Sequence, residues 1–240
     1  MKILSIGNSF SEDAQRYLHS LAAANNKDLM CVNLYIGGCP LEAHYINLTD
    51  NEKSYDFQVN GVNTNLKVSV KEVIKSNKWD YITLQQASHL SFDFNSYVPY
   101  IEKINEWTRL RCPDAKILLH QTWAYPENHE RLSEVGFSTT KEMFSKVREA
   151  YDMAQKTINP DGVIRSGEAI LEAYSTFPDI VYRDQLHASY GFGRYLLGCV
   201  WYKTLFGENP KVHISSFDEP VDSKYLLQIN QIINHICNVK

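Results

Sequence analysis

Two short segments at opposite ends of the chain hold residue types that together make a nucleophile and its base. Ser9 follows an apolar run that ends at Gly7, and residues 184–187 read D-Q-L-H. A serine hydroxyl becomes an effective nucleophile at neutral pH when an oriented imidazole takes its proton. Asp184 and His187 are three residues apart, a spacing that puts both side chains on one side of a turn. The chemistry that this set favours is hydrolysis through a covalent acyl–serine intermediate.

Each segment also has a plainer explanation. Ser9 and Ser11 stand where a helix begins, and serine is a favoured helix N-cap. An aspartate and a histidine three residues apart also form ordinary surface ion pairs. The assignment of an active site therefore depends on whether the fold brings the two segments together.

Apolar runs and helical patterns alternate along the chain. Strands are predicted at residues 2–7, 29–36, 80–85, 115–121 and 162–165, and helices at 11–22, 41–48, 68–76, 97–111, 139–157, 168–174, 191–206 and 223–237. This alternation predicts one three-layer α/β/α domain over residues 1–240, with a doubly wound, mostly parallel, five-stranded sheet of the flavodoxin-like kind. Weak alternation around Asn60-Gly61 predicts a small hairpin insertion near residues 50–66.

Polar or glycine-bearing turns follow four of the predicted strands, at Ser9, Gly37-Gly38, Gln85-Gln86 and residues 121–123. Ligands on such sheets bind beyond the carboxyl ends of the strands, so these turns are expected at one rim. The backbone N–H groups of Ser9 and Gly38 are candidate donors to a developing oxyanion. Gly37-Gly38 also fits an ordinary turn.

Composition narrows the class of partner. The net charge is −4 and no Lys/Arg cluster is present, which argues against nucleic acid. The five cysteines are scattered without a C-x-x-C pair, and the histidines lack metal-ligand spacing, so neither a disulfide framework nor a metal is predicted. No apolar run approaches the ~18 residues of a membrane span. The chain as it stands reads as cytoplasmic, or as secreted or periplasmic if an export signal was removed upstream.

The two segments and their order resemble a known superfamily. Residues 7–10 (G-N-S-F) after the first strand, Gly38 after the second and Asp184-x-x-His187 before a C-terminal helix are similar to the SGNH (GDSL-type) hydrolases. Residues 184–207 resemble the closing block of a bacterial, esterase-like branch, and the likeness in element order covers nearly the whole chain. The resemblance implies Ser9 as nucleophile, His187 as general base and Asp184 as its orienting acid. It also implies that Ser9 and Gly38 form part of the oxyanion hole, and this mechanism needs no cofactor.

Two positions depart from the pattern of the superfamily. Asn8 stands where the first block usually has aspartate, a chemically mild change. The third block usually presents Gly-x-Asn, whose amide completes the oxyanion hole, whereas residues 85–89 read Q-Q-A-S-H. A glutamine amide offers the same donor on a longer arm, so Gln86 is the predicted substitute. Gln85, Ser88 and His89 are the alternatives.

The residues after the fourth strand and near the third block are expected to contact substrate, namely Gln121, Trp123 and His89. Trp123 fits a sugar-stacking or acyl-shaping role, and equally a buried lid of the core. The predicted activity is removal of a small acyl group, most simply acetyl, from a carbohydrate or similar small polar alcohol. The alternatives are a thioesterase or lysophospholipase-like hydrolase with a longer acyl slot, and a catalytically silent α/β binding module.

Overall fold

The computed structural model describes residues 1–127, 129–214 and 218–237, and seven of its strands form one sheet in the order β4-β3-β2-β1-β5-β6-β7. The neighbours β2, β1, β5, β6 and β7 run parallel, and β3 and β4 add an antiparallel edge. The strands are β1 (Lys2–Gly7), β2 (Met30–Tyr35), β3 (Tyr55–Val59), β4 (Val62–Val68), β5 (Tyr81–Leu84), β6 (Lys116–His120) and β7 (Gly162–Ile164). Parallel strands with helices between them confirm the predicted α/β class.

The predicted number of strands was wrong, because the sheet has seven strands rather than five. The segment expected to be a separate hairpin insertion is β3–β4, which joins the sheet where Val32 pairs with Val59. Nearly every residue of β4 is exposed, and only Tyr55 and Gln58 are buried in β3. An edge hairpin with so few buried side chains gives only a weak alternating pattern. The sequence therefore did not predict that its strands pair with the sheet.

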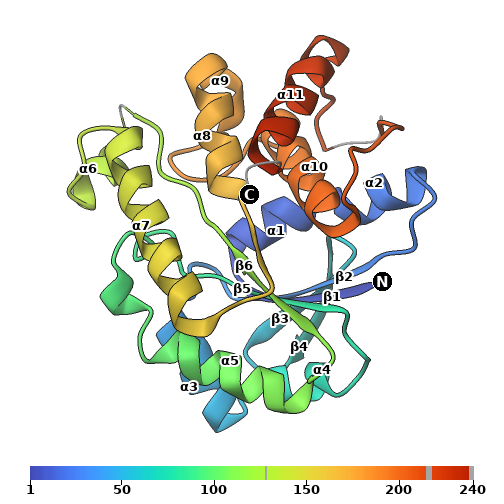
Figure 1. Cartoon of the computed structure of the whole chain (residues 1–240), viewed down its shortest axis with the longest axis vertical. Helices are drawn as coiled ribbons and strands as arrows, with labels where there is room; N and C mark the ends of the chain where they lie inside the picture. The colour runs from blue at the N-terminus through green and yellow to red at the C-terminus, as the bar shows by residue number, and fades with distance from the viewer. Residues whose placement is uncertain (128, 215–217, 238–240) are drawn as a thin grey trace.

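Helices cover both faces of the sheet (Figure 1). Successive side chains of β1 point to opposite faces, so Ile3 packs in one core and Leu4 in the other. The Ile3 side holds α1 (Ser9–Gln15), α2 (Leu18–Ala24), α8 (Ser166–Thr176), α9 (Pro178–Val181), α10 (Phe192–Phe206) and α11 (Leu226–Cys237). The Leu4 side holds α3 (Leu41–Asp50), α4 (Val70–Ile74), α5 (Tyr100–Arg111), α6 (Glu130–Glu134) and α7 (Thr140–Ile158).

Helix α10 is the central helix of its layer. Nearly all of its residues are buried, and it contacts α1, α2, α8 and α11. This burial fixes the loop that precedes α10, residues 182–191, against the N-terminal part of the chain. The single helix predicted over residues 11–22 is two helices, α1 and α2, with a break at Arg16-Tyr17.

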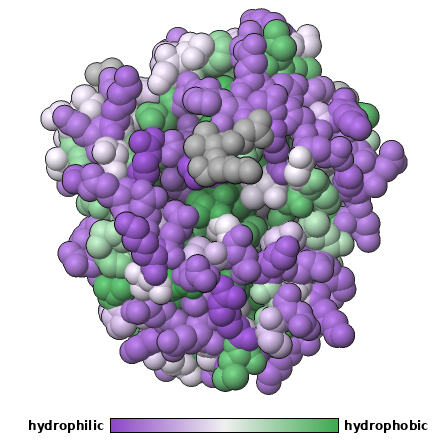
Figure 2. All heavy atoms as spheres, viewed as in Figure 1, coloured by the Kyte–Doolittle hydropathy of each residue, from purple (hydrophilic) through white to green (hydrophobic). Residues whose placement is uncertain are grey.

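Polar side chains cover most of the face seen in Figure 2. None of the helices in the described ranges is both long and apolar enough to cross a membrane.

Candidate active site

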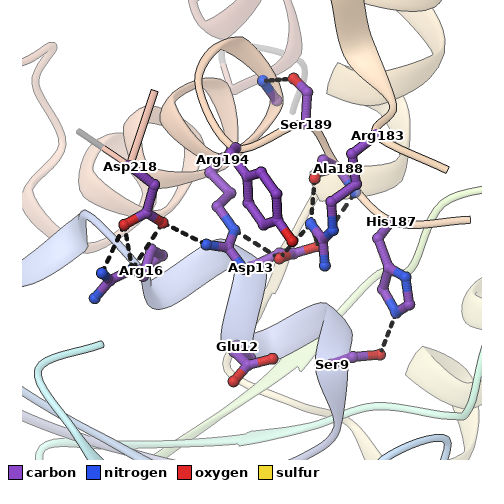
Figure 3. Close-up of polar contacts among 12 residues, drawn as sticks. Ser9, Glu12, Asp13, Arg16, Arg183, His187, Ala188, Ser189, Arg194 and Asp218 are labelled. Atoms are coloured by element: carbon purple, nitrogen blue, oxygen red, sulfur yellow. Dashed lines mark hydrogen bonds and ion pairs between the residues drawn. The ribbon is translucent and has the colours of Figure 1, made fainter. Parts of the chain in front are cut away.

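Three side chains from opposite ends of the sequence form one hydrogen-bonded set. Ser9 Oγ lies 3.0 Å from His187 Nε2, and His187 Nδ1 lies 2.8 Å from Asp184 Oδ2 (Figure 3 shows the Ser9–His187 contact). A carboxylate only accepts hydrogen bonds, so the ring proton is on Nδ1 and the Nε2 lone pair faces the serine hydroxyl. This is the geometry in which an imidazole can remove the proton of Ser9.

Ser9 is held at the junction of β1 and α1. Asn8 is the N-cap of α1 in a reciprocal capping box with Ser11, so the helix begins at Ser9. Gly7 is required here because a Cβ atom at this position would lie 2.0 Å from Ser11 Oγ. As the first residue of α1, Ser9 has no helix carbonyl to receive its own N–H.

Asp184 closes a tight turn around its own side chain. Its Oδ1 accepts hydrogen bonds from the backbone N–H groups of Leu186 at 2.9 Å and His187 at 2.7 Å. Partial burial raises the pKa of Asp184, but these backbone bonds and the His187 ring outweigh that effect and hold the pKa below its ordinary value. The carboxylate is therefore ionised at neutral pH and orients the imidazole.

A fully buried carboxylate ties this turn to the helix that begins with Ser9. Asp13, one turn further along α1, accepts bonds from Arg183 Nη1 at 2.9 and 3.0 Å and from Arg194 Nε at 2.8 Å (Figure 3). It also accepts the backbone N–H of Ala188, the residue after His187, at 3.2 Å. We call Asp13, Arg183 and Arg194 the Asp13 clamp. It fixes the His187 turn and α10 on the same helix as Ser9.

Trp123 supports the site from inside the core, which is the second of the two roles predicted for it and not contact with substrate. Its side chain is fully buried and stacks on Phe10 with ring centroids 3.8 Å apart. Its Nε1–H donates to the carbonyl of Leu186 at 2.8 Å. The indole thus braces the neighbours of both Ser9 and His187 and has no surface left for a sugar.

The predicted oxyanion role of Gln86 is also corrected. Its amide nitrogen donates to the carbonyl and hydroxyl of Ser96, and its amide oxygen accepts from the N–H groups of Leu41 and Ala87. The side chain is fully buried and joins three loops, so its donors point away from Ser9. Gln121 is likewise committed elsewhere, because its Oε1 accepts the N–H of Glu168 at the start of α8.

The rim of the sheet encloses a cavity of about 270 Å³ beside Ser9. Of the predicted site residues, Ser9, Gly38, His89 and His187 meet there. Gly38 has a φ of +61°, a left-handed conformation that favours glycine. Ser88 also lines the cavity, and its Oγ lies 3.0 Å from the hydroxyl of Tyr125. The remaining wall is formed by Asn8, Phe10, Tyr35, Gly37, Tyr125, Arg131 and Leu186.

A buried polar chain behind the cavity sets the orientation of Asn8. Gln85 Nε2 donates to Asn8 Oδ1 at 2.6 Å, and Gln85 Oε1 lies 2.7 Å from His120 Nδ1. His120 Nε2 contacts Ser166 Oγ, which accepts the indole N–H of Trp201. Gln85 Oε1 only accepts, so His120 Nδ1 donates to it, and the Nε2 of this neutral ring accepts from the Ser166 hydroxyl.

Asn8 fits this position because its amide both accepts and donates. Its Nδ2 donates to the carbonyl of Cys39 at 3.3 Å while its Oδ1 accepts from Gln85 and from the N–H of Phe10. An aspartate would face the Cys39 carbonyl with a second acceptor. The asparagine therefore joins the β1–α1 turn to the loop that carries Gly38.

Two buried histidines make the stability of the fold depend on pH. Burial lowers the pKa of both His44 and His120 from 6.5 to about 3. Below about pH 6.5 the unfolded chain binds protons that the folded chain does not. The free energy of unfolding therefore decreases as the pH is lowered. The expected loss is about 1.4 kcal/mol per pH unit for each histidine between pH ~6.5 and ~3. Urea unfolding at pH 6.5, 6.0 and 5.5 measures this slope.

The matched variants His120→Gln and His44→Gln each remove one of the two groups. Each should reduce the histidine part of the slope by about half, whatever its effect on stability at pH 7. A slope that neither substitution changes would show that these histidines do not titrate on unfolding.

The Asp13 clamp and part of the cavity wall, Arg131 included, were not predicted from the sequence. Asp13 carried a signal, because it lies four residues after Ser9 and so faces the same side of the helix. Arg194 carried one too, as a charged residue in the first turn of a largely apolar helix. Tyr125 was expected at the pocket, because it belongs to the stretch that follows the fourth predicted strand, and it lines the cavity. Arg131 carried no signal, since it follows β6 by a loop whose path the sequence does not define.

Solved structures place this fold in a class. A candidate SGNH hydrolase from Slackia heliotrinireducens is 21% identical, with a TM-score of 0.63 over 85% of this chain and 98% of that chain. An acetyl xylan esterase, AlAXEase, is 14% identical, with a TM-score of 0.50 over 86% of this chain and 100% of that chain. The chain has the fold of the SGNH (GDSL-type) hydrolases, which confirms the resemblance at the level of fold.

A nearer relative defines the family. A DUF4886 family protein from Bacteroides uniformis is 31% identical, with a TM-score of 0.90 over 99% of this chain and 95% of that chain. The family model described as a domain of unknown function, DUF4886, matches residues 2–230. The chain therefore belongs to the DUF4886 family. A comparison with curated proteins gives no match.

Proposed function

We propose that the protein is a serine ester hydrolase that forms an acyl intermediate on Ser9. The observation that carries this proposal is the Ser9–His187–Asp184 set, with contacts of 3.0 and 2.8 Å. His187 Nε2 takes the hydroxyl proton as Ser9 Oγ attacks the ester carbonyl, and the resulting imidazolium is stabilised by Asp184. The alkoxide leaving group then receives this proton and departs as the alcohol.

The second half of the reaction uses the same groups in reverse order. Water enters the cavity, His187 removes a proton from it, and the hydroxide attacks the acyl–Ser9 carbonyl. Collapse of the tetrahedral intermediate returns the proton to Ser9 and releases the carboxylic acid. The balance is one ester and one water converted to one alcohol and one acid.

The oxyanion is assigned to the backbone N–H groups of Ser9 and Gly38, both of which line the cavity. The third donor cannot be Gln86, whose amide is committed to Ser96. Ser88 replaces it as our candidate, because its hydroxyl is on the cavity wall and is hydrogen-bonded to Tyr125. Each such donor is typically worth about 10²–10³ in turnover.

The cavity favours a short acyl group on a polar alcohol. A volume of about 270 Å³ is small for a binding site, and its wall presents hydroxyl, imidazole and guanidinium groups as well as Phe10 and Leu186. The acetyl xylan esterase of the same fold supports acetyl removal from a carbohydrate as the leading activity. A long-chain thioesterase or lysophospholipase would need a longer apolar slot.

Covalent labelling tests the nucleophile. A fluorophosphonate should add to the wild-type protein once, and peptide mapping should place the adduct on Ser9. Ser9→Ala should remove the adduct, whereas Ser175→Ala, on the exposed side of α8, should retain it. An adduct at another serine, or none, would contradict the proposal. Turnover of p-nitrophenyl acetate, butyrate and octanoate then reports the preferred acyl length, which we expect to be acetate.

A further inference from the structure

The wall of the cavity beside Ser9 has an arginine and no carboxylate side chain, in a chain whose net charge is negative. Arg131, on α6, is the one arginine or lysine of its wall, and no aspartate or glutamate lines it. The chain as a whole carries −4. Wall and chain therefore have opposite charge, which concentrates anions at this opening.

Arg131 has no carboxylate within 4 Å among the residues that the structure describes. Other arginines near the two ends of the chain pair closely, Arg16 with Asp218 and Arg194 with Asp13. An exposed arginine is common on protein surfaces. An exposed arginine that lines the cavity of a nucleophile and lacks a counter-charge there is available to a ligand.

The neighbours of Arg131 add neutral hydrogen-bonding groups. Burial lowers the pKa of His89, and the positive charge of Arg131 lowers it further, so this imidazole is neutral at pH 7. Both Arg131 and His89 line the cavity. Tyr125 and Ser88 contribute hydroxyl groups to the same wall. One full positive charge among neutral donors matches a ligand with one negative charge.

We propose that the natural substrate of this site is an ester whose alcohol carries a carboxylate, and that Arg131 pairs with this group. The planar guanidinium can donate two parallel hydrogen bonds to a carboxylate, which gives orientation as well as attraction. An acetylated acidic sugar has this chemistry. The inference rests on the proposed hydrolysis at Ser9 and names the substrate class of that site.

A matched pair of substrates isolates the charge. We would compare kcat/KM for an O-acetylated methyl uronoside and for its uronamide, which has the same ring and ester but no charge. Wild type should prefer the uronoside by about tenfold, as expected for one charge-assisted contact. The preference should decrease as salt is raised.

Variants of Arg131 test the assignment. Arg131→Gln should lower kcat/KM for the uronoside by about tenfold more than it lowers kcat/KM for the uronamide. Arg131→Lys, which keeps the charge but not the planar fork, should retain part of the preference. Arg111→Gln, at the end of α5, is the control and should change neither substrate. Equal use of both substrates by wild type, or an unchanged preference in Arg131→Gln, would overturn the proposal.

Two further measurements separate the remaining outcomes. A sulfated, acetylated hexose preferred over the uronoside would overturn the assignment to a carboxylate. If wild type hydrolyses none of these esters, the proposed hydrolysis at Ser9 is contradicted for this substrate class. Binding of an anion by Arg131 is then tested separately, by calorimetry of free uronate and uronamide with Ser9→Ala. Uronate binding that Arg131→Gln weakens supports the site, and equal binding of the two ligands refutes it.

Discussion

Replacement of Ser9 or His187 with alanine should lower kcat for p-nitrophenyl acetate by about 10⁴-fold or more. Ser9→Ala removes the attacking oxygen, and His187→Ala leaves the hydroxyl with no base at 3.0 Å. Because the two residues act as one unit, the double variant should be no slower than either single variant. Steady-state rates, with a burst measurement for the acyl intermediate, test both statements.

Asp184→Asn separates orientation from charge. Its side-chain oxygen can still accept from the N–H groups of Leu186 and His187, so the turn is preserved. Its amide would then donate to His187 Nδ1, and the ring proton would move to Nε2, the atom that must accept from Ser9. The expected result is a folded protein with a kcat lowered by up to about 10⁴-fold.

Turnover that survives the loss of Ser9 and of His187 would refute the mechanism, provided that circular dichroism shows folded variants.

The positions of Ser9, Gly38 and His187 could be predicted because each depends on a local rule. A parallel strand ends at the binding rim of its sheet, and Gly7 and Gly38 mark where two such strands stop. The D-x-x-H spacing likewise fixes the relation of Asp184 to His187 within a single turn. These inferences need only the order of the elements, which the apolar pattern supplies.

The errors arose where a side chain chooses between partners that are distant in sequence. Gln86 was expected to replace the missing asparagine, but its amide finds Ser96 and the N–H of Leu41, at the start of α3. For Trp123 both contact with substrate and a place in the core were predicted, and stacking on Phe10 holds it in the core. Residue type gives the donors available at a position, whereas the packing of neighbouring loops decides where they point.

The Asp13 clamp also depends on partners that are distant in sequence. Asp13 is separated from Arg183 by 170 residues and from Arg194 by 181, and only the packing of α10 on α1 brings them together. The sequence shows a carboxylate within an amphipathic helix, for which an exposed position is the ordinary expectation. In the fold its side chain is fully buried and hydrogen-bonded on both oxygens.

Asp13→Asn should lower the free energy of unfolding by about 3–5 kcal/mol. The substitution leaves the guanidinium groups of Arg183 and Arg194, only 17% and 9% exposed, without their buried counter-charge. Urea unfolding at pH 7.5 measures the loss. Asp218→Asn is the matched control, because Asp218 is 27% exposed and pairs with Arg16 and Arg194 nearer the surface. Its loss should be about 1 kcal/mol or less.

The same substitution should also affect catalysis, because the clamp holds the backbone of Ala188 beside His187. Asp13 contacts neither Ser9 Oγ nor the imidazole among the bonds of the described residues, so a kcat lowered in the folded variant would report misplacement of His187. The decrease should be in kcat more than in KM, and the rate of fluorophosphonate labelling of Ser9 should fall in parallel. An Asp13→Asn protein that unfolds within 1 kcal/mol of wild type and keeps its kcat would show that the clamp neither stabilises nor aligns the site.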